Sequence, residues 1–149
     1  MGDSKNTDPK LTKVRVREIN KIFDDKHDII KNKYIGEFIT NYINCEALAR
    51  KLISYYMADR QMKQPTRYQK LKTDTIARAA KHFEVDISED AIEQVFKGGN
   101  GKRNHKTPRQ LRNAYIHTKS TNDALEIVSR NKELIKRMQV WLNAVKYTR

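Results

Sequence analysis

Helical periodicity is strongest in the segment KNKYIGEFITNYINCEALARKLISYYM, which spans residues 31–57. Its apolar residues recur three and four positions apart along the whole segment, which is the spacing of an amphipathic helix. The pattern predicts one long helix here, despite the glycine at position 36. Because apolar residues cover more than half of its circumference, this helix should contact several others, as the core helix of a bundle does.

Further helices are expected on both sides of this segment, each introduced by a capping residue or by a new apolar repeat. They are expected over about 10–24 and from about Thr66, Ser88, Pro108 and Asn122 or Asp123. The last one should continue unbroken to about Val145 and place Trp141 in the core or at a dimer interface. The chain has 149 residues with only 5 Gly and 3 Pro, which favours long helices. We therefore predict an all-α fold, with a single helical domain over 10–149 that follows a disordered tail over 1–9.

Charge is the main compositional signal. The chain has 31 Lys and Arg against 18 Asp and Glu, a formal net charge of +13. This excess attracts polyanions, so we expect nucleic acid as the leading partner and an anionic membrane surface as the second. The single Cys45 cannot form an intrachain disulfide, and the sequence shows no apolar leader and no stretch that approaches a transmembrane span. These features predict a cytoplasmic protein that does not enter the membrane.

Chemically useful side chains are concentrated between residues 97 and 119. This segment contains seven Lys or Arg and no acidic residue, and its first part is rich in glycine. We expect a mobile cationic loop, followed by a helix, with RNA phosphates as ligands. The residues predicted to bind RNA are Lys97, Lys102, Arg103, Lys106, Arg109 and Lys119.

A helix is expected to begin at Pro108, because Thr107 can cap it and proline suits the first turn. At about 100° per residue, Asn113 and His117 would lie about 40° apart on one face, with Arg109 one turn before Asn113 on the same stripe. Arg112 is close enough along the helix for its long side chain to reach the same pocket. The opposite, inward side is expected to hold Leu111, Ala114 and Tyr115.

The segment RNAYIH, residues 112–117, resembles the signature of the HEPN superfamily, which is an arginine, a polar residue, three variable residues and a histidine. Members of this superfamily are small all-helical proteins, many of them metal-independent endoribonucleases. The resemblance implies a four- or five-helix bundle whose motif helix forms a homodimer interface, so that two motifs make one composite site. It implies phosphate binding by Arg112, proton transfer by His117 and the common polar second position for Asn113.

The resemblance further implies RNA cleavage without a metal or another cofactor. The ribose 2′-hydroxyl would attack the adjacent phosphorus and the 5′-oxygen would leave, which yields a 2′,3′-cyclic phosphate. The family setting implies a toxin or antiphage abortive-infection effector, controlled by an antitoxin or another regulatory partner. The alternative is a non-catalytic RNA-binding helical protein, in which the same cations bind phosphate and His117 has no role. A DNA-binding regulator is less favoured, because no compact helix-turn-helix is evident.

Three further residues are candidates for accessory roles. Glu46 and Arg50 would either form a half-buried ion pair one helical turn apart or reach the active pocket from the neighbouring helix. His105 is a candidate accessory proton carrier. The Asp and His residues over 24–28 point in different directions, so we interpret them as a helix junction and expect no metal site.

Overall fold

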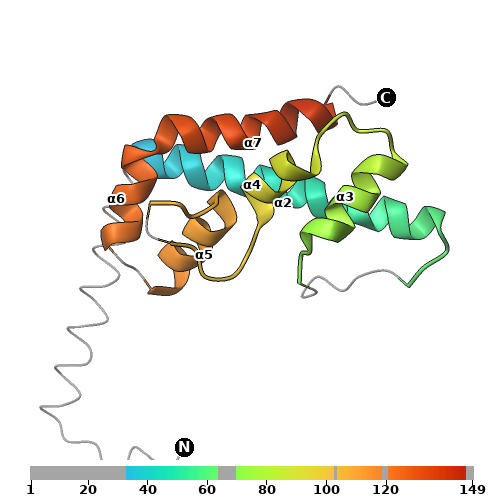
Figure 1. The fold of residues 1–149 in the computed structure, drawn as a ribbon, viewed down its shortest axis with the longest axis horizontal. Helices are drawn as coiled ribbons and strands as arrows, with labels where there is room; N and C mark the ends of the chain where they lie inside the picture. The colour runs from blue at the N-terminus through green and yellow to red at the C-terminus, as the bar shows by residue number, and fades with distance from the viewer. Residues whose placement is uncertain (1–32, 64–69, 103, 119–120, 147–149) are drawn as a thin grey trace, which may run out of the picture.

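The computed structural model describes residues 33–63, 70–102, 104–118 and 121–146 of the chain (Figure 1). The expected tail over 1–9 and the expected helix over 10–24 lie outside the described residues. Within them the fold has six helices and no strand, so the predicted all-α class is confirmed. The implied count of four or five helices is wrong, since the described residues alone hold six. The helices are α2 (Lys33–Asp59), α3 (Thr73–His82), α4 (Glu89–Phe96), α5 (Pro108–Thr118), α6 (Thr121–Ser129) and α7 (Asn131–Lys146).

Helix α2 is the long helix that the apolar repeat predicted. Both of its ends fall within two residues of the predicted bounds, and it passes through Gly36 without a break. One face is buried, and it consists of Ile35, Phe38, Tyr42, Cys45, Ala49 and Ile53. This helix contacts α3, α5, α6 and α7, so its predicted role as the core helix is confirmed.

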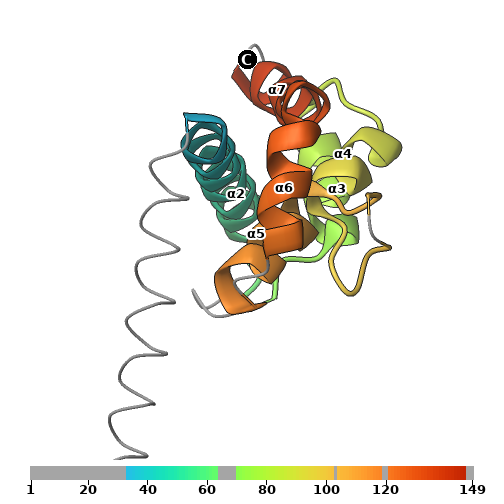
Figure 2. The ribbon, with the colours of Figure 1, turned by 90° about the vertical axis from the view of Figure 1, so that its left-hand side faces the viewer.

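Helices α2 and α7 lie side by side and run in the same direction (Figure 1). Near their first turns, Asn131 Nδ2 donates a hydrogen bond to Tyr34 O at 3.2 Å. Further along, Trp141 Nε1 donates to Cys45 O at 3.1 Å. Because these two helices pair, the four helices between them in the chain pack on the remaining faces of the pair. Viewed end-on, α7, α6 and α5 follow one another from top to bottom, with α2 on one side and α4 on the other (Figure 2).

Aromatic residues fill the centre of the core. Trp141 is fully buried, so of its two predicted placements, core or dimer interface, the structure shows the core. Its ring meets that of Phe96 edge-on at a centroid distance of 5.3 Å. Phe96 also lies 6.5 Å from the ring of Tyr42. Cys45 is buried beside them as a free thiol, and burial raises its pKa to about 12. Since Phe96 is the last residue of α4, the core fixes the point at which the next loop begins.

The last expected helix is two helices, which corrects the prediction of one unbroken helix. α6 ends at Ser129 and α7 begins at Asn131, with no Gly or Pro between them. Ser129 Oγ donates to Glu126 O at 3.2 Å, and Arg130 N donates to the same carbonyl at 2.9 Å. The bond from Asn131 to Tyr34 then draws α7 along α2. The bend between α6 and α7 thus coincides with contacts that the apolar repeat does not contain.

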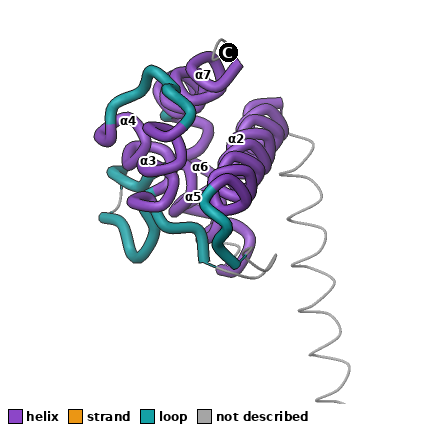
Figure 3. The backbone as a smooth tube through the Cα atoms, turned by 90° about the vertical axis from the view of Figure 1, so that its right-hand side faces the viewer, coloured by secondary structure: helices purple, strands orange, loops and turns teal. Residues whose placement is uncertain are grey.

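The other helix starts agree with the predictions in part. Ser88 Oγ accepts from Ala91 N at 3.1 Å, so the predicted cap of α4 is confirmed. The expected start at Thr66 lies outside the described residues, and the described helix begins at Thr73. The connection between α4 and α5, residues 97–107, is a loop in its described part and leads directly into the motif helix (Figure 3).

Candidate functional site

Helix α5 begins with a reciprocal hydrogen-bonded cap. Thr107 Oγ1 accepts from Gln110 N at 3.2 Å, and Gln110 Oε1 accepts from Thr107 N at 2.9 Å. This Thr-x-x-Gln capping box satisfies two N–H groups that the helix itself cannot. The predicted start at Pro108 with Thr107 as the cap is confirmed. Gln110 is not among the predicted site residues, although its spacing from Thr107 is a recognisable signal.

The loop before α5 is hydrogen-bonded to the two residues of this cap. Thr107 Oγ1 donates to Lys97 O at 2.7 Å, and Gln110 Nε2 donates to Gly98 O at 3.0 Å. At Gly101 a Cβ atom would lie 2.5 Å from Gln110 Oε1, so the absence of a side chain allows this close approach. The sequence predicted a mobile cationic loop, but the backbone is held against α5 at each of these points.

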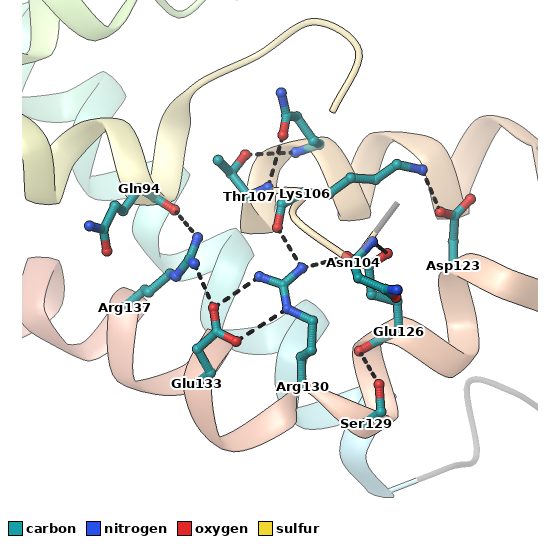
Figure 4. Close-up of polar contacts among 11 residues, drawn as sticks. Gln94, Asn104, Lys106, Thr107, Asp123, Glu126, Ser129, Arg130, Glu133 and Arg137 are labelled. Carbon is teal, nitrogen blue, oxygen red and sulfur yellow. Dashed lines mark hydrogen bonds and ion pairs between the residues drawn. The ribbon is translucent and has the colours of Figure 1, made fainter. Parts of the chain in front are cut away.

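Arg130, which lies between α6 and α7, anchors the far end of the loop (Figure 4). Its guanidinium donates to Lys106 O at 2.9 Å and pairs with the carboxylates of Glu126 and Glu133. The Arg130 and Glu126 side chains are only 11 % and 4 % exposed, so this pair is largely removed from water. Hydrogen bonding from Arg130 also holds the pKa of Glu133 below its ordinary value. A buried ion pair becomes costly when either partner is lost, so the loop position depends on this network.

Two acidic residues of α6 lie against the cationic loop (Figure 4). Asp123 Oδ1 accepts from Lys106 Nζ at 2.7 Å, and Glu126 Oε1 accepts from Asn104 N at 2.9 Å. Both acidic residues are buried. The segment 97–119 contains no acid in sequence, but the fold supplies two, and the protein itself compensates the charge of Lys106.

A cleft of about 460 Å³ lies between the glycine loop and one face of α5, and we call it the His117 cleft. Its lining includes His117, Asn113, Gln110, Lys106, Asn100 and Asp123. His117 is exposed and Asn113 is half-buried, and both line the cleft, as their predicted shared face requires. Asn100 and Asp123 are not among the predicted residues. No local signal marks Asp123, because it reaches the cleft only through the packing of α6 on α5.

Arg112 lies on the α2 side of α5 rather than in this cleft. Its Nη1 donates to Asn113 Oδ1 at 3.0 Å, and its Cζ lies 5.8 Å from the centroid of the Tyr42 ring. Burial raises the pKa of Tyr42, so the ring stays neutral and the contact is a cation–π interaction. The expectation that Arg112 reaches the pocket of His117 is not met in this conformation. Asn113 joins the two, because it bonds Arg112 and lines the cleft with His117.

Arg109 holds the start of the loop from the inside. It is half-buried, and its Nη1 donates to Phe96 O at 2.9 Å and to Leu71 O. Gly98 packs on the same guanidinium, since a Cβ there would lie 3.4 Å from Arg109 Cζ. Arg109 was predicted to bind RNA from the same stripe of α5 as Asn113 and His117. It does not line the His117 cleft, so that shared stripe is not met, and its contacts join the segment before α3 to the end of α4.

The remaining predicted residues lie on the surface or outside the described part of the chain. Lys97, Lys102 and His105 are exposed, and Arg103 and Lys119 lie outside the described residues. On α2, Glu46 Oε1 and Arg50 Nη2 form the expected ion pair at 3.2 Å, and neither residue lines the His117 cleft. On the inward side of α5, Leu111 and Tyr115 are buried, as predicted. Ala114 is half-buried and lines the His117 cleft, so its expected place on the opposite side is wrong.

Three observations bear on the class of protein. Among the described residues, no three or more His, Cys, Asp or Glu side chains are grouped so that they could hold a metal ion. No helix in the described ranges combines the length and the apolar character that crossing a lipid bilayer requires. Comparison of the chain with family models, curated proteins and solved structures finds no match.

Proposed function

We propose that this protein is an endoribonuclease that uses Arg112, Asn113 and His117, as the HEPN-like signature implies. The observation that carries the proposal is the exposed imidazole of His117, which shares a cleft with Asn113 beside a cationic loop. Asn113 in turn accepts a hydrogen bond from Arg112, so the three signature residues are in contact or share one cleft. The net charge of +13 supports a polyanionic substrate.

The proposed reaction is an internal transesterification. A general base removes the proton of the ribose 2′-hydroxyl, whose oxygen attacks the adjacent phosphorus, and a general acid protonates the departing 5′-oxygen. Histidine suits either role because its ordinary pKa lies near neutrality, and such proton transfer contributes roughly 10²–10⁴-fold in rate. Arginine stabilises the negative charge that develops on the phosphorus oxygens. DNA lacks the 2′-hydroxyl and should resist cleavage.

The proposal includes a homodimer in which two copies of α5 face each other. A single imidazole cannot act as base and acid in the same step, whereas two copies of His117 across an interface can. Beside His117, Ile116 is 39 % exposed and offers apolar surface for such a contact. The guanidinium of Arg112 has five N–H donors, of which one bonds Asn113, so donors remain for a phosphate.

The proposal also covers the setting of this activity. A nuclease that acts on cellular RNA must be restrained, so we propose a cytoplasmic toxin or antiphage effector with an antitoxin or regulatory partner. The excess of basic residues suits an acidic partner.

Cleavage of mixed RNA in EDTA tests the proposal. The variants are His117→Ala and Arg112→Ala, and the control is His82→Ala, which removes an exposed histidine of α3 that does not line the His117 cleft. We expect the wild type and the control to cut and leave cyclic phosphate ends, with each motif variant at least about 10²-fold slower. Equal cleavage by all four proteins would show that the motif is not catalytic.

The second candidate is an RNA-binding protein that does not cleave. The position of Arg112 over Tyr42, outside the His117 cleft, favours this alternative. In that case the wild type should leave RNA intact and bind it with an affinity that falls steeply as salt rises. The same preparation of RNA and protein distinguishes the two candidates.

A further inference from the structure

A second cleft lies on the other side of the glycine loop from His117. It has a volume of about 350 Å³ and shares Gly99 with the His117 cleft. Its charged lining consists of Lys70, Lys72, Lys97, Arg109 and Asp74, and we call it the lysine cleft. Four cations against one carboxylate leave a net charge of +3 in its lining.

The two clefts differ in how their charges are compensated. In the His117 cleft, Lys106 is paired with Asp123 at 2.7 Å. In the lysine cleft, Asp74 already accepts from Thr75 N at 2.9 Å, at the first turn of α3. The three lysines are exposed, and no described carboxylate forms an ion pair with any of them. Of the two clefts, the lysine cleft is therefore the one that retains a net attraction for an anion.

Arg109 gives this cleft a fixed cation. Its Nη1 is held by the carbonyls of Leu71 and Phe96, and no described carboxylate pairs with it. The carbonyl of Phe96 lies at the C-terminal end of α4, where a helix favours positive charge. A guanidinium held in this way loses little conformational freedom when an anion binds, which lowers the entropic cost of binding.

We propose that the lysine cleft binds a backbone phosphate of an RNA strand whose adjoining part enters the His117 cleft. This inference rests on the proposed function, because it takes RNA as the ligand. Gly99 forms part of both clefts, so a strand that crosses the loop at this point reaches both. Phosphate contacts of this kind position a strand without reading its sequence. The lysine cleft thus sets the register of the strand, and His117 meets the phosphate beyond it.

Binding of a short single-stranded 2′-O-methyl RNA tests this site. The methylated strand has no 2′-hydroxyl nucleophile, so binding is measured without cleavage, by fluorescence anisotropy over a range of salt concentrations. The test variant combines Lys72→Gln and Lys97→Gln. The control combines Lys132→Gln and Lys136→Gln, two exposed lysines of α7 that carry the same change in charge.

We expect the cleft variant to bind roughly tenfold more weakly at low salt, with the slope of log affinity against log salt reduced by about 0.7. The control should bind like the wild type. Conversely, Asp74→Asn should strengthen binding, since it removes the only carboxylate among the described residues that line the cleft. Equal losses in the cleft and control pairs would overturn the proposal, because they would show attraction to overall charge alone.

Two further arms separate the possible failures. Adenosine monophosphate at the same concentration as the RNA should not displace the strand, and displacement would overturn the proposal in favour of a mononucleotide site. If the wild type leaves ordinary RNA intact while the cleft pair still loses binding, the nuclease proposal fails and the phosphate site stands. If the wild type cleaves and the cleft pair binds normally, only the phosphate site is refuted.

Discussion

Substitution of Gly101 by alanine should destabilise the protein mainly through its contact with Gln110, with a smaller cost from Lys106. The added Cβ would lie 2.5 Å from Gln110 Oε1 and 2.8 Å from Lys106 Cγ, so a side chain must shift. Lys106 has a flexible stem, but Gln110 is only 8 % exposed, and its carboxamide bonds Thr107 N and Gly98 O. Displacing it would remove half of the capping box, worth about 1 kcal/mol, and a further hydrogen bond worth about 1 kcal/mol. We expect the free energy of unfolding to fall by roughly 2 kcal/mol.

Urea unfolding, followed by the fluorescence of the single, fully buried Trp141, measures this loss. Gly101→Ala is compared in the presence of Gln110 and in a Gln110→Ala background, where the obstructing carboxamide is absent. In that background the substitution should cost only about 0.5 kcal/mol, because the coupled contact is gone.

Gly99→Ala is the matched control for this cycle. Gly99 has a φ of +84° and nothing within 4 Å of its Cβ position, so alanine is strained there by its backbone alone. Its cost of about 1 kcal/mol should be the same in both backgrounds. If Gly101→Ala also costs the same in both backgrounds, the contact with Gln110 is not the cause and the reasoning is refuted.

Three further predictions concern buried or paired groups. Glu126→Gln should lower the free energy of unfolding by about 2 kcal/mol, because Arg130 then keeps only its ion pair with Glu133. Thermal unfolding measures this change, and a negligible loss of stability would contradict the prediction. The folded protein lowers the pKa of Glu133, so this residue contributes to the free energy of unfolding. The contribution is fully present above the ordinary glutamate pKa of about 4.3 and is lost as the pH falls through the lower pKa of the folded state. Glu133→Gln should flatten the pH dependence of the urea unfolding midpoint in that acid range. An unchanged pH dependence would show that the pKa of Glu133 is not lowered by folding. Cys45, buried and with a pKa near 12, should react slowly with a thiol reagent until denaturant is added, so rapid labelling of the folded protein would contradict its burial.

Features controlled by nearby residues were predictable from the sequence. The apolar repeat of α2 spans many turns, so its bounds could be placed within two residues. The caps at Ser88 and Thr107 involve partners three residues away, which is a distance that a sequence pattern can record. The shared face of Asn113 and His117 follows from helical geometry alone.

Features that depend on distant contacts were not predictable in the same way. The bend at Arg130 involves a contact between α7 and the first turns of α2, 97 residues earlier in the chain. The pairing of Lys106 with Asp123 crosses 17 residues and compensates one positive charge of the acid-free segment. The position of Arg112 also depends on a distant contact, because the aromatic ring that it covers belongs to α2.

These long-range contacts give the two sides of the loop different tasks under the proposed function. On the side of His117, the carboxylate of Asp123 compensates Lys106, so an RNA strand gains little binding free energy from that lysine. On the side of Arg109, cations outnumber carboxylates, and the strand gains most of its attraction before it reaches the imidazole. Tight binding at the reacting phosphate itself would stabilise the substrate as much as the transition state and would not raise the rate of the chemical step. Binding free energy gained at a neighbouring phosphate, in the lysine cleft, can instead raise the rate. It holds the 2′-hydroxyl and the phosphorus in place for attack.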